Sequence, residues 1–210
     1  MKNNLWKRLL IILFYGSLWG IMEASLGYAL HFLPVLVAGG ILFPVAFGIL
    51  FRAYQTSGHR VDMLYVGLLA ALIKSVNLLM PQISIWKTIN PMISIVFEAL
   101  TITVAFGIIA QKKPLRTLGA ISLASIGWRA LYLGFMGGQY QMTGFLSVHL
   151  ENWSNAILFL LIYGILSGVV ATLVFGGIVA LGKRWQLPWM VKASLAIPAL
   201  GLAVLLTVIL

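Results

Sequence analysis

Hydrophobic residues fall into long, nearly continuous runs along this chain, separated by short polar connections. Continuous apolar runs of about 20 residues are typical of helices that cross a bilayer, whereas barrel strands alternate in polarity. Runs and helix breakers predict seven helices, over residues 9–30, 33–51, 63–80, 88–110, 117–136, 154–181 and 189–210. We therefore predict an all-α, polytopic transmembrane bundle of six to seven helices, folded as a single membrane domain over residues 1–210.

Two segments depart from this simple pattern. Pro34, Gly39, Gly40 and Pro44 interrupt the second run, so we expect that helix to be kinked or partly re-entrant. Residues 137–153 form the one sizeable polar connection, and we expect a loop with a functional role there.

The composition agrees with a chain that lies mainly in lipid. Hydrophobic residues make up 61% of the sequence and charged residues 9%, whereas an ordinary soluble domain carries roughly 25% charged residues. The absence of cysteine excludes disulfides and thiolate metal sites. The first apolar run continues past Glu23 without a small-residue cleavage site, which predicts a retained first span rather than a signal peptide.

The net charge of +10 comes from basic residues that lie between the apolar runs. Because they form no single patch, we expect lipid headgroups as their partners and no nucleic acid. The bias of these basic residues toward alternate connections predicts a cytoplasmic N-terminus. Seven spans would then put the C-terminus outside, and six spans would return it to the cytoplasm. Eleven of the fourteen lie at the N-terminus or in the second, fourth and sixth connections: Lys2, Lys7, Arg8, Arg52, Arg60, Lys112, Lys113, Arg116, Lys183, Arg184 and Lys192.

Four ionisable residues lie inside predicted spans: Glu23, Lys74, Glu98 and Arg129. A charge at the bilayer centre costs at least about 2.5–3.5 kcal/mol, so each of them needs a partner or a watery cavity. Two acids and two bases can neutralise one another. With a cytoplasmic N-terminus, all four lie at mid-membrane or in the outer half.

Helical periodicity gives each of these charges small or polar neighbours on the same face, as Asn77 lies near Lys74 and Tyr132 near Arg129. Such faces are typical of a bundle interior. Two interpretations stay open, a polar pocket that opens outward and an internal ion-pair network. Aromatic residues near the outer boundary also fit a membrane-surface belt. The candidate substrate-binding residues are Glu23, Lys74, Asn77, Glu98, Trp128, Arg129 and Tyr132.

Gly16, Gly20 and Ala24 form a row of small residues at four-residue spacing on the first predicted helix. Such a row lets a second helix approach closely. The row predicts either a docking surface for a partner subunit or close packing within the chain.

Enzymatic signatures are missing from the sequence. There is no H-E-x-x-H, no G-x-S-x-G and no Walker lysine in a glycine-rich loop. His31, His59 and His149 lie far apart along the chain, so we expect no metal site and no cofactor. We therefore expect a protein that is not an enzyme.

In its size, its outward polar cluster and its small-residue row, the chain resembles the substrate-binding S components of energy-coupling factor (ECF) vitamin transporters. The row begins with glycines where the family usually has alanines, and the run 189–210 would add a helix to the family's six. The resemblance implies capture of a small water-soluble nutrient outside a prokaryotic cell (inner) membrane. It also implies docking through the small-residue row to a transmembrane coupling subunit driven by ATPases.

Two other functions are compatible with the same residues. The chain could be a structural or assembly subunit of a larger membrane complex, whose charges pair with neighbouring chains. It could also be a proton-coupled carrier that uses Glu23 or Glu98 as its proton site.

Overall fold

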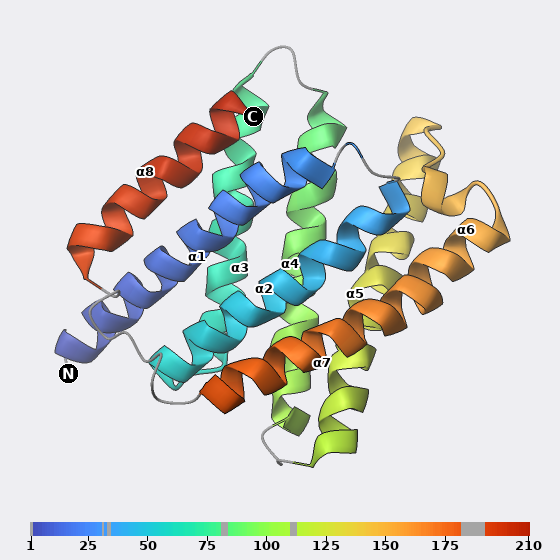
Figure 1. The fold of residues 1–210 in the computed structure, drawn as a ribbon. Helices are drawn as coiled ribbons and strands as arrows, with labels where there is room; N and C mark the ends of the chain where they lie inside the picture. The colour runs from blue at the N-terminus through green and yellow to red at the C-terminus, as the bar shows by residue number, and fades with distance from the viewer. Residues whose placement is uncertain (1, 31, 33–34, 81–83, 110–112, 182–191) are drawn as a thin grey trace.

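Every element in the described part of the chain is helical in the computed structural model (Figure 1). The description covers residues 2–30, 32, 35–80, 84–109, 113–181 and 192–210, so His31, Lys183 and Arg184 lie outside it. The long helices are α1 (Lys2–Leu30), α2 (Val35–Ser57), α3 (Val61–Lys74), α4 (Ile85–Ile109), α5 (Pro114–Thr143), α7 (Tyr163–Leu181) and α8 (Ala193–Ile209).

Short helical pieces complete the described chain. The 3₁₀ helix η1 (Ser75–Leu79) continues α3, and the 3₁₀ helix η2 (Val148–Leu150) lies in the loop after α5. The helix α6 (Trp153–Ile157) and one π-helical turn, η3 (Leu158–Ile162), lead directly into α7.

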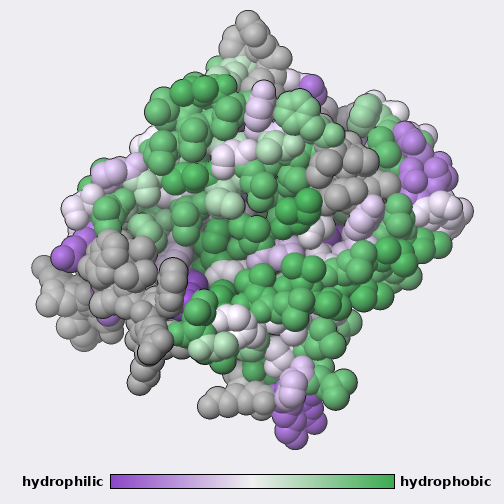
Figure 2. Space-filling view, in the orientation of Figure 1, coloured by the Kyte–Doolittle hydropathy of each residue, from purple (hydrophilic) through white to green (hydrophobic). Residues whose placement is uncertain are grey.

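The structure confirms the predicted all-α bundle, and a long helix overlaps each of the seven predicted runs. Among the described residues, five helical spans are long and apolar enough to cross a membrane: Leu5–Leu30, Val61–Leu79, Ile85–Ile109, Pro114–Thr143 and Trp153–Leu181. The protein is therefore a multi-pass membrane protein. Figure 2 agrees with this, because hydrophobic side chains cover most of the face that α8, α1, α2 and α7 present.

The long helices form two layers (Figure 1). One layer holds α8, α1, α2 and α7 side by side, and the other holds α3, α4 and α5. Between the layers, α1 packs on α3, α2 rests on α3 and α4, and α7 packs on α5. Successive long helices run in opposite directions. We call the end at which α1, α3 and α5 finish the distal end, and the opposite end the proximal end.

The second helix continues from Val35 to Ser57 with Pro44 inside it, so Pro44 does not end the helix. One prediction about local structure is wrong. The predicted loop 137–153 is helical as far as Thr143, because no residue stops α5 before Gly144. Gly144 has a φ of 71° and donates its N–H to the Tyr140 carbonyl at 2.8 Å, a left-handed cap that suits glycine.

The proximal half of the interior is mainly apolar. The Phe106 ring of α4 stacks against Phe47 and Phe51 of α2, with ring centroids 5.9 and 5.6 Å apart. Phe175 of α7 completes this group, 4.8 Å from Phe51. Aromatic pairs at these distances stabilise the packing beyond the area that they bury. Most of the buried polar groups lie in the distal half instead.

One ion pair ties α1 to α3 at the proximal end. Arg8 donates through Nε and Nη2 to the two carboxylate oxygens of Asp62, at 3.1 and 2.6 Å. Asp62 is fully buried in the first turn of α3, where the helix dipole also favours a negative charge. Sequence analysis did not identify this pair, because Arg8 looked like a surface charge and Asp62 lies at the edge of its span.

Candidate functional site

The four charged residues predicted to lie inside the membrane all face the interior of the bundle. Arg129 is 0% exposed, Glu98 2% and Glu23 8%, and Lys74 is half-buried. They come from four helices that pack in the order α1, α3, α4, α5. Small residues allow this close packing, because Gly67 of α3 lies against Ala99 of α4 and Trp19 of α1.

These side chains form a continuous series of electrostatic neighbours. Glu23 interacts with Lys74, and Glu98 interacts with both Glu23 and Arg129. The carboxyl groups of Glu23 and Glu98 are therefore the two middle members of the series. Within the described residues, no two of the four form a direct ion pair. Glu23 Oε1 instead accepts a hydrogen bond from Trp19 Nε1 at 3.3 Å. The acids are thus close to the bases without being neutralised by direct contact.

Arg129 holds three helices together through hydrogen bonds. Its Nη1 donates to the Ser125 carbonyl and hydroxyl at 2.8 and 2.7 Å, one turn earlier on α5. Its Nη2 donates to the Gly39 carbonyl of α2 at 3.0 Å and to Ser167 Oγ of α7 at 2.9 Å. A hydrogen bond of 2.9 Å between the Ser125 and Ser167 hydroxyls closes the network. Only Nε of this guanidinium has no partner among the described residues.

Aromatic rings surround the same guanidinium. Its Cζ atom lies 4.5 Å from the ring centroid of Trp128, 5.5 Å from that of Phe159 and 6.0 Å from that of Phe43. Rings at these distances stabilise a desolvated cation through their quadrupoles. Hydrogen bonds, aromatic rings and the nearby Glu98 together surround the buried guanidinium.

The π-helical turn η3 carries Phe159 in this group. A π turn adds a residue to the helical turn and is often found at functional sites. Here it joins α6 to α7, and Phe159 is 2% exposed. The Phe159 ring lies 5.7 Å from Trp128 and 4.4 Å from His149, measured between centroids. It thus connects the Arg129 environment to the loop at the distal end.

That loop inserts His149 into the bundle. The imidazole packs edge-on against Tyr132 at 5.9 Å, and its Nδ1 lies 3.0 Å from Ser147 Oγ. Burial lowers the pKa of His149 to about 4, so the ring is neutral at pH 7. The loop after Gly144 therefore covers the polar interior with a neutral, tightly packed side chain.

Several buried polar atoms in the distal half have no hydrogen-bond partner among the described residues. Each such atom costs about 1–3 kcal/mol when it is removed from water, so native interiors contain few of them. Besides Arg129 Nε they are Glu98 Oε2, Trp128 Nε1, both amide atoms of Gln139, Asn77 Oδ1, Thr88 Oγ1 and Asn90 Oδ1. Both donors and acceptors are present among these atoms.

The aromatic and amide candidates occupy different environments. Trp128 is 2% exposed and lies against Gly39, so it belongs to the interior and not to a belt at the membrane surface. Tyr132 is half-buried beside Trp128, with ring centroids 6.1 Å apart. Asn77 is buried in η1 with its carbonyl oxygen unpaired. Trp153, at 84% exposed, is the kind of residue that fits a surface belt.

The small-residue row on α1 is used for packing within the chain. A Cβ added at Gly16 would lie 2.7 Å from Leu69 Cδ2 of α3, and one at Gly20 would meet both Ile73 of α3 and Ala203 of α8. Ala24 is 4% exposed. In this arrangement the row is covered by α3 and α8, so it presents no free surface for a partner subunit.

Four important contributors were not identified from the sequence. Ser167 could have been noticed, because a hydroxyl in so apolar a run as α7 needs a partner. Gln139 was assigned to a loop that proved to be helix. The Gly39 carbonyl and the π turn at Phe159 are backbone features for which residue types carry no signal.

No protein-family model, no curated protein and no solved structure matches the chain. The geometry of the site is therefore the basis of the functional argument.

Proposed function

We propose that this protein is a membrane-embedded substrate-capture subunit of an importer, which binds a small water-soluble solute in its distal interior. The observation that carries the proposal is the set of unpaired buried polar atoms in the distal half, which includes Glu98 Oε2, Trp128 Nε1 and Arg129 Nε. A bundle that needed only packing would be more stable with apolar residues at those positions. A bound solute would supply the missing partners and repay the cost of burying them.

The basic residues support entry of the solute from outside the cell. In the described part of the chain, Arg8, Arg52, Arg60, Lys113 and Arg116 all lie near the proximal end, where α2 and α4 finish and α3 and α5 begin. Under the positive-inside rule, that end faces the cytoplasm. The distal half with its polar interior would then face the outside of a prokaryotic cell membrane.

Resemblance to ECF S components supports the same function in a more specific form. An S component captures its nutrient alone and needs a coupling subunit and ATPases for transport, which agrees with the missing Walker motif. The packing of Gly16 and Gly20 against α3 and α8 changes one part of this proposal. A coupling subunit would have to dock on a face other than the small-residue row.

Two alternatives each have one observation in their favour. The four hydrogen bonds of the Arg129 guanidinium favour a structural or assembly subunit, because they hold α2, α5 and α7 together without any ligand. The neighbouring carboxyl groups of Glu23 and Glu98 favour a proton-coupled carrier. Uptake by the protein alone in sealed vesicles, without any ATPase, would establish the carrier.

The proposal is tested by identifying the solute that copurifies with the protein. Protein extracted in mild detergent is denatured, and the released small molecules are identified by mass spectrometry. We expect one solute in near-stoichiometric amount. Glu98→Gln should retain about tenfold less, because it removes a buried charge-assisted hydrogen bond. Glu151→Gln, at an exposed site in the distal loop, is the matched control and should retain the wild-type amount.

Two results would contradict this proposal. One is wild-type protein that releases no solute when purified from cells grown in rich medium. The other is a solute that Glu98→Gln retains as well as the wild type does.

A further inference from the structure

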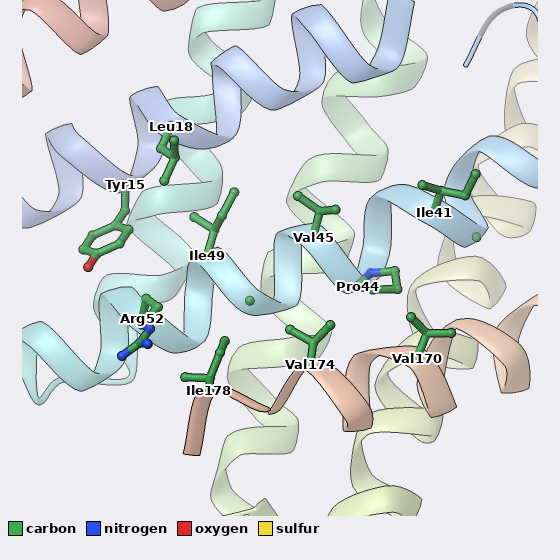
Figure 3. A pocket seen from close by; sticks show the side chains of 12 residues that line it. Tyr15, Leu18, Ile41, Pro44, Val45, Ile49, Arg52, Val170, Val174 and Ile178 are labelled. Carbon is green, nitrogen blue, oxygen red and sulfur yellow. The ribbon is translucent and has the colours of Figure 1, made fainter. Parts of the chain in front are cut away.

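A groove follows α2 on the face where it lies between α1 and α7 (Figure 3). Its volume is about 620 Å³. The α2 side chains form its floor, and aliphatic residues such as Leu18 of α1 and Val174 of α7 form its walls. The groove opens on the hydrophobic face of Figure 2, so its surroundings are membrane lipid.

The length of the groove corresponds to one leaflet of the bilayer. Its floor extends from Ile41 to Arg52, and eleven residues of helix rise about 16 Å. Half of a hydrocarbon core of about 30 Å is nearly the same distance. An acyl chain of one leaflet has this length, so the groove suits a lipid chain.

The proximal end of the groove is positively charged. Arg52 lies there and donates through Nη1 to Gln55 Oε1 at 3.1 Å, and its other side-chain N–H groups have no partner among the described residues. The Tyr15 hydroxyl also lines this end and lies 3.2 Å from Thr56 Oγ1. A guanidinium beside hydroxyl groups is well suited to a phosphate ester.

We infer that this groove binds an anionic phospholipid of the leaflet at the proximal end. One acyl chain lies along α2 between α1 and α7, and the headgroup phosphate contacts Arg52 and the Tyr15 hydroxyl. The headgroup at Arg52 lies at the membrane surface, since the groove spans a leaflet from there to Ile41. This lipid site is separate from the polar interior and does not depend on the solute-binding proposal.

Native mass spectrometry of purified, delipidated protein tests this site. The probes are dioleoyl phosphatidylglycerol and dioleoyl phosphatidylcholine, which differ in headgroup charge but have the same chains. Wild-type protein should retain one phosphatidylglycerol in preference to phosphatidylcholine. Arg52→Gln should lower that preference about fivefold, since a basic side chain near an anionic headgroup contributes about 1 kcal/mol. Lys113→Gln removes an exposed proximal charge outside the groove and should leave the preference unchanged.

A second pair of variants tests the acyl-chain part of the groove. Val174→Phe fills the groove and should reduce retention of both lipids, whereas Leu173→Phe, on the exposed neighbouring face of α7, should not. Equal retention of the two lipids by wild-type protein would overturn the inference. So would unchanged retention in Val174→Phe, or a photo-crosslinker at position 174 that yields protein adducts and no lipid adducts in membranes.

Discussion

Replacing Arg129 with methionine is expected to destabilise the protein by about 3–5 kcal/mol, which is typical when one member of a buried charged network is removed. The substitution removes the donors to Ser125, Ser167 and the Gly39 carbonyl and leaves the two serine hydroxyls buried. It also removes the positive charge with which Glu98 interacts. Thermal unfolding in detergent should show the loss, together with looser packing of α2 and α7.

The matched control is Lys113→Met, which removes an exposed charge at the proximal end and should change the unfolding temperature little. The double variant Glu98→Gln with Arg129→Met should be more stable than the sum of the two single losses implies, because their charges interact. Wild-type stability in Arg129→Met would show that the network contributes nothing to the fold.

This expectation differs from the one that the sequence supports. From sequence alone, Arg129→Ala should weaken ligand binding and leave membrane insertion intact. In the structure, most of the Arg129 N–H donors bind protein acceptors, whereas Glu98 Oε2 has no partner among the described residues. Glu98 is therefore the better residue with which to test binding, and Arg129 the better residue with which to test stability.

Replacing Gly67 with alanine is expected to destabilise the protein by about 1–3 kcal/mol, the usual cost of overpacking a core. The added Cβ would lie 2.2 Å from Ala99 Cβ and 3.3 Å from the Trp19 ring. Ala99 Cβ is fixed to the α4 backbone, so α3 and α4 must move apart. This movement would also shift Trp19, which donates to Glu23.

The matched control is Gly134→Ala on α5, where an added Cβ meets nothing within 4 Å. There the higher helix propensity of alanine should raise the free energy of unfolding by up to about 1 kcal/mol. Thermal unfolding of the two variants should therefore show shifts of opposite sign. Shifts of the same sign would contradict the close contact between α3 and α4 at Gly67.

The sequence predicts the helices and their interior faces well, because in a membrane both follow from the free-energy cost of exposing polar groups to lipid. Backbone amides must be hydrogen-bonded in lipid, which requires helices, and a charged residue such as Glu98 must face the interior of the bundle. Ser125 lies four residues before Arg129, which places it on the same face of α5, and it binds the guanidinium. These predictions depend only on residue type and helical period.

The partners across helices were not predictable in the same way. The pairing of Arg8 with Asp62, the Gly39 carbonyl that binds Arg129, and the packing of α8 over Gly20 depend on which helices become neighbours. Hydrophobic periodicity shows which face is buried but not what covers it. For this reason the sequence alone leaves both docking and internal packing open for the small-residue row.

If the distal interior holds a polar solute that enters from outside, a polar position inside it should be reached by a water-soluble reagent from that side. The absence of native cysteine allows a direct test with single-cysteine variants. Thr88 and Ser17 are both 0% exposed and both carry a small hydroxyl, but Thr88 Oγ1 in the distal half is unpaired, whereas Ser17 Oγ donates to the Leu13 carbonyl. A charged, membrane-impermeant methanethiosulfonate is added to intact cells that express Thr88→Cys or Ser17→Cys.

Our account predicts that Thr88→Cys is modified from outside and that Ser17→Cys is not. It also predicts that adding the copurifying solute slows the reaction at position 88. If Thr88→Cys is as unreactive as Ser17→Cys, or reacts only when the reagent reaches the cytoplasmic side, the distal interior is not a solute site open to the outside.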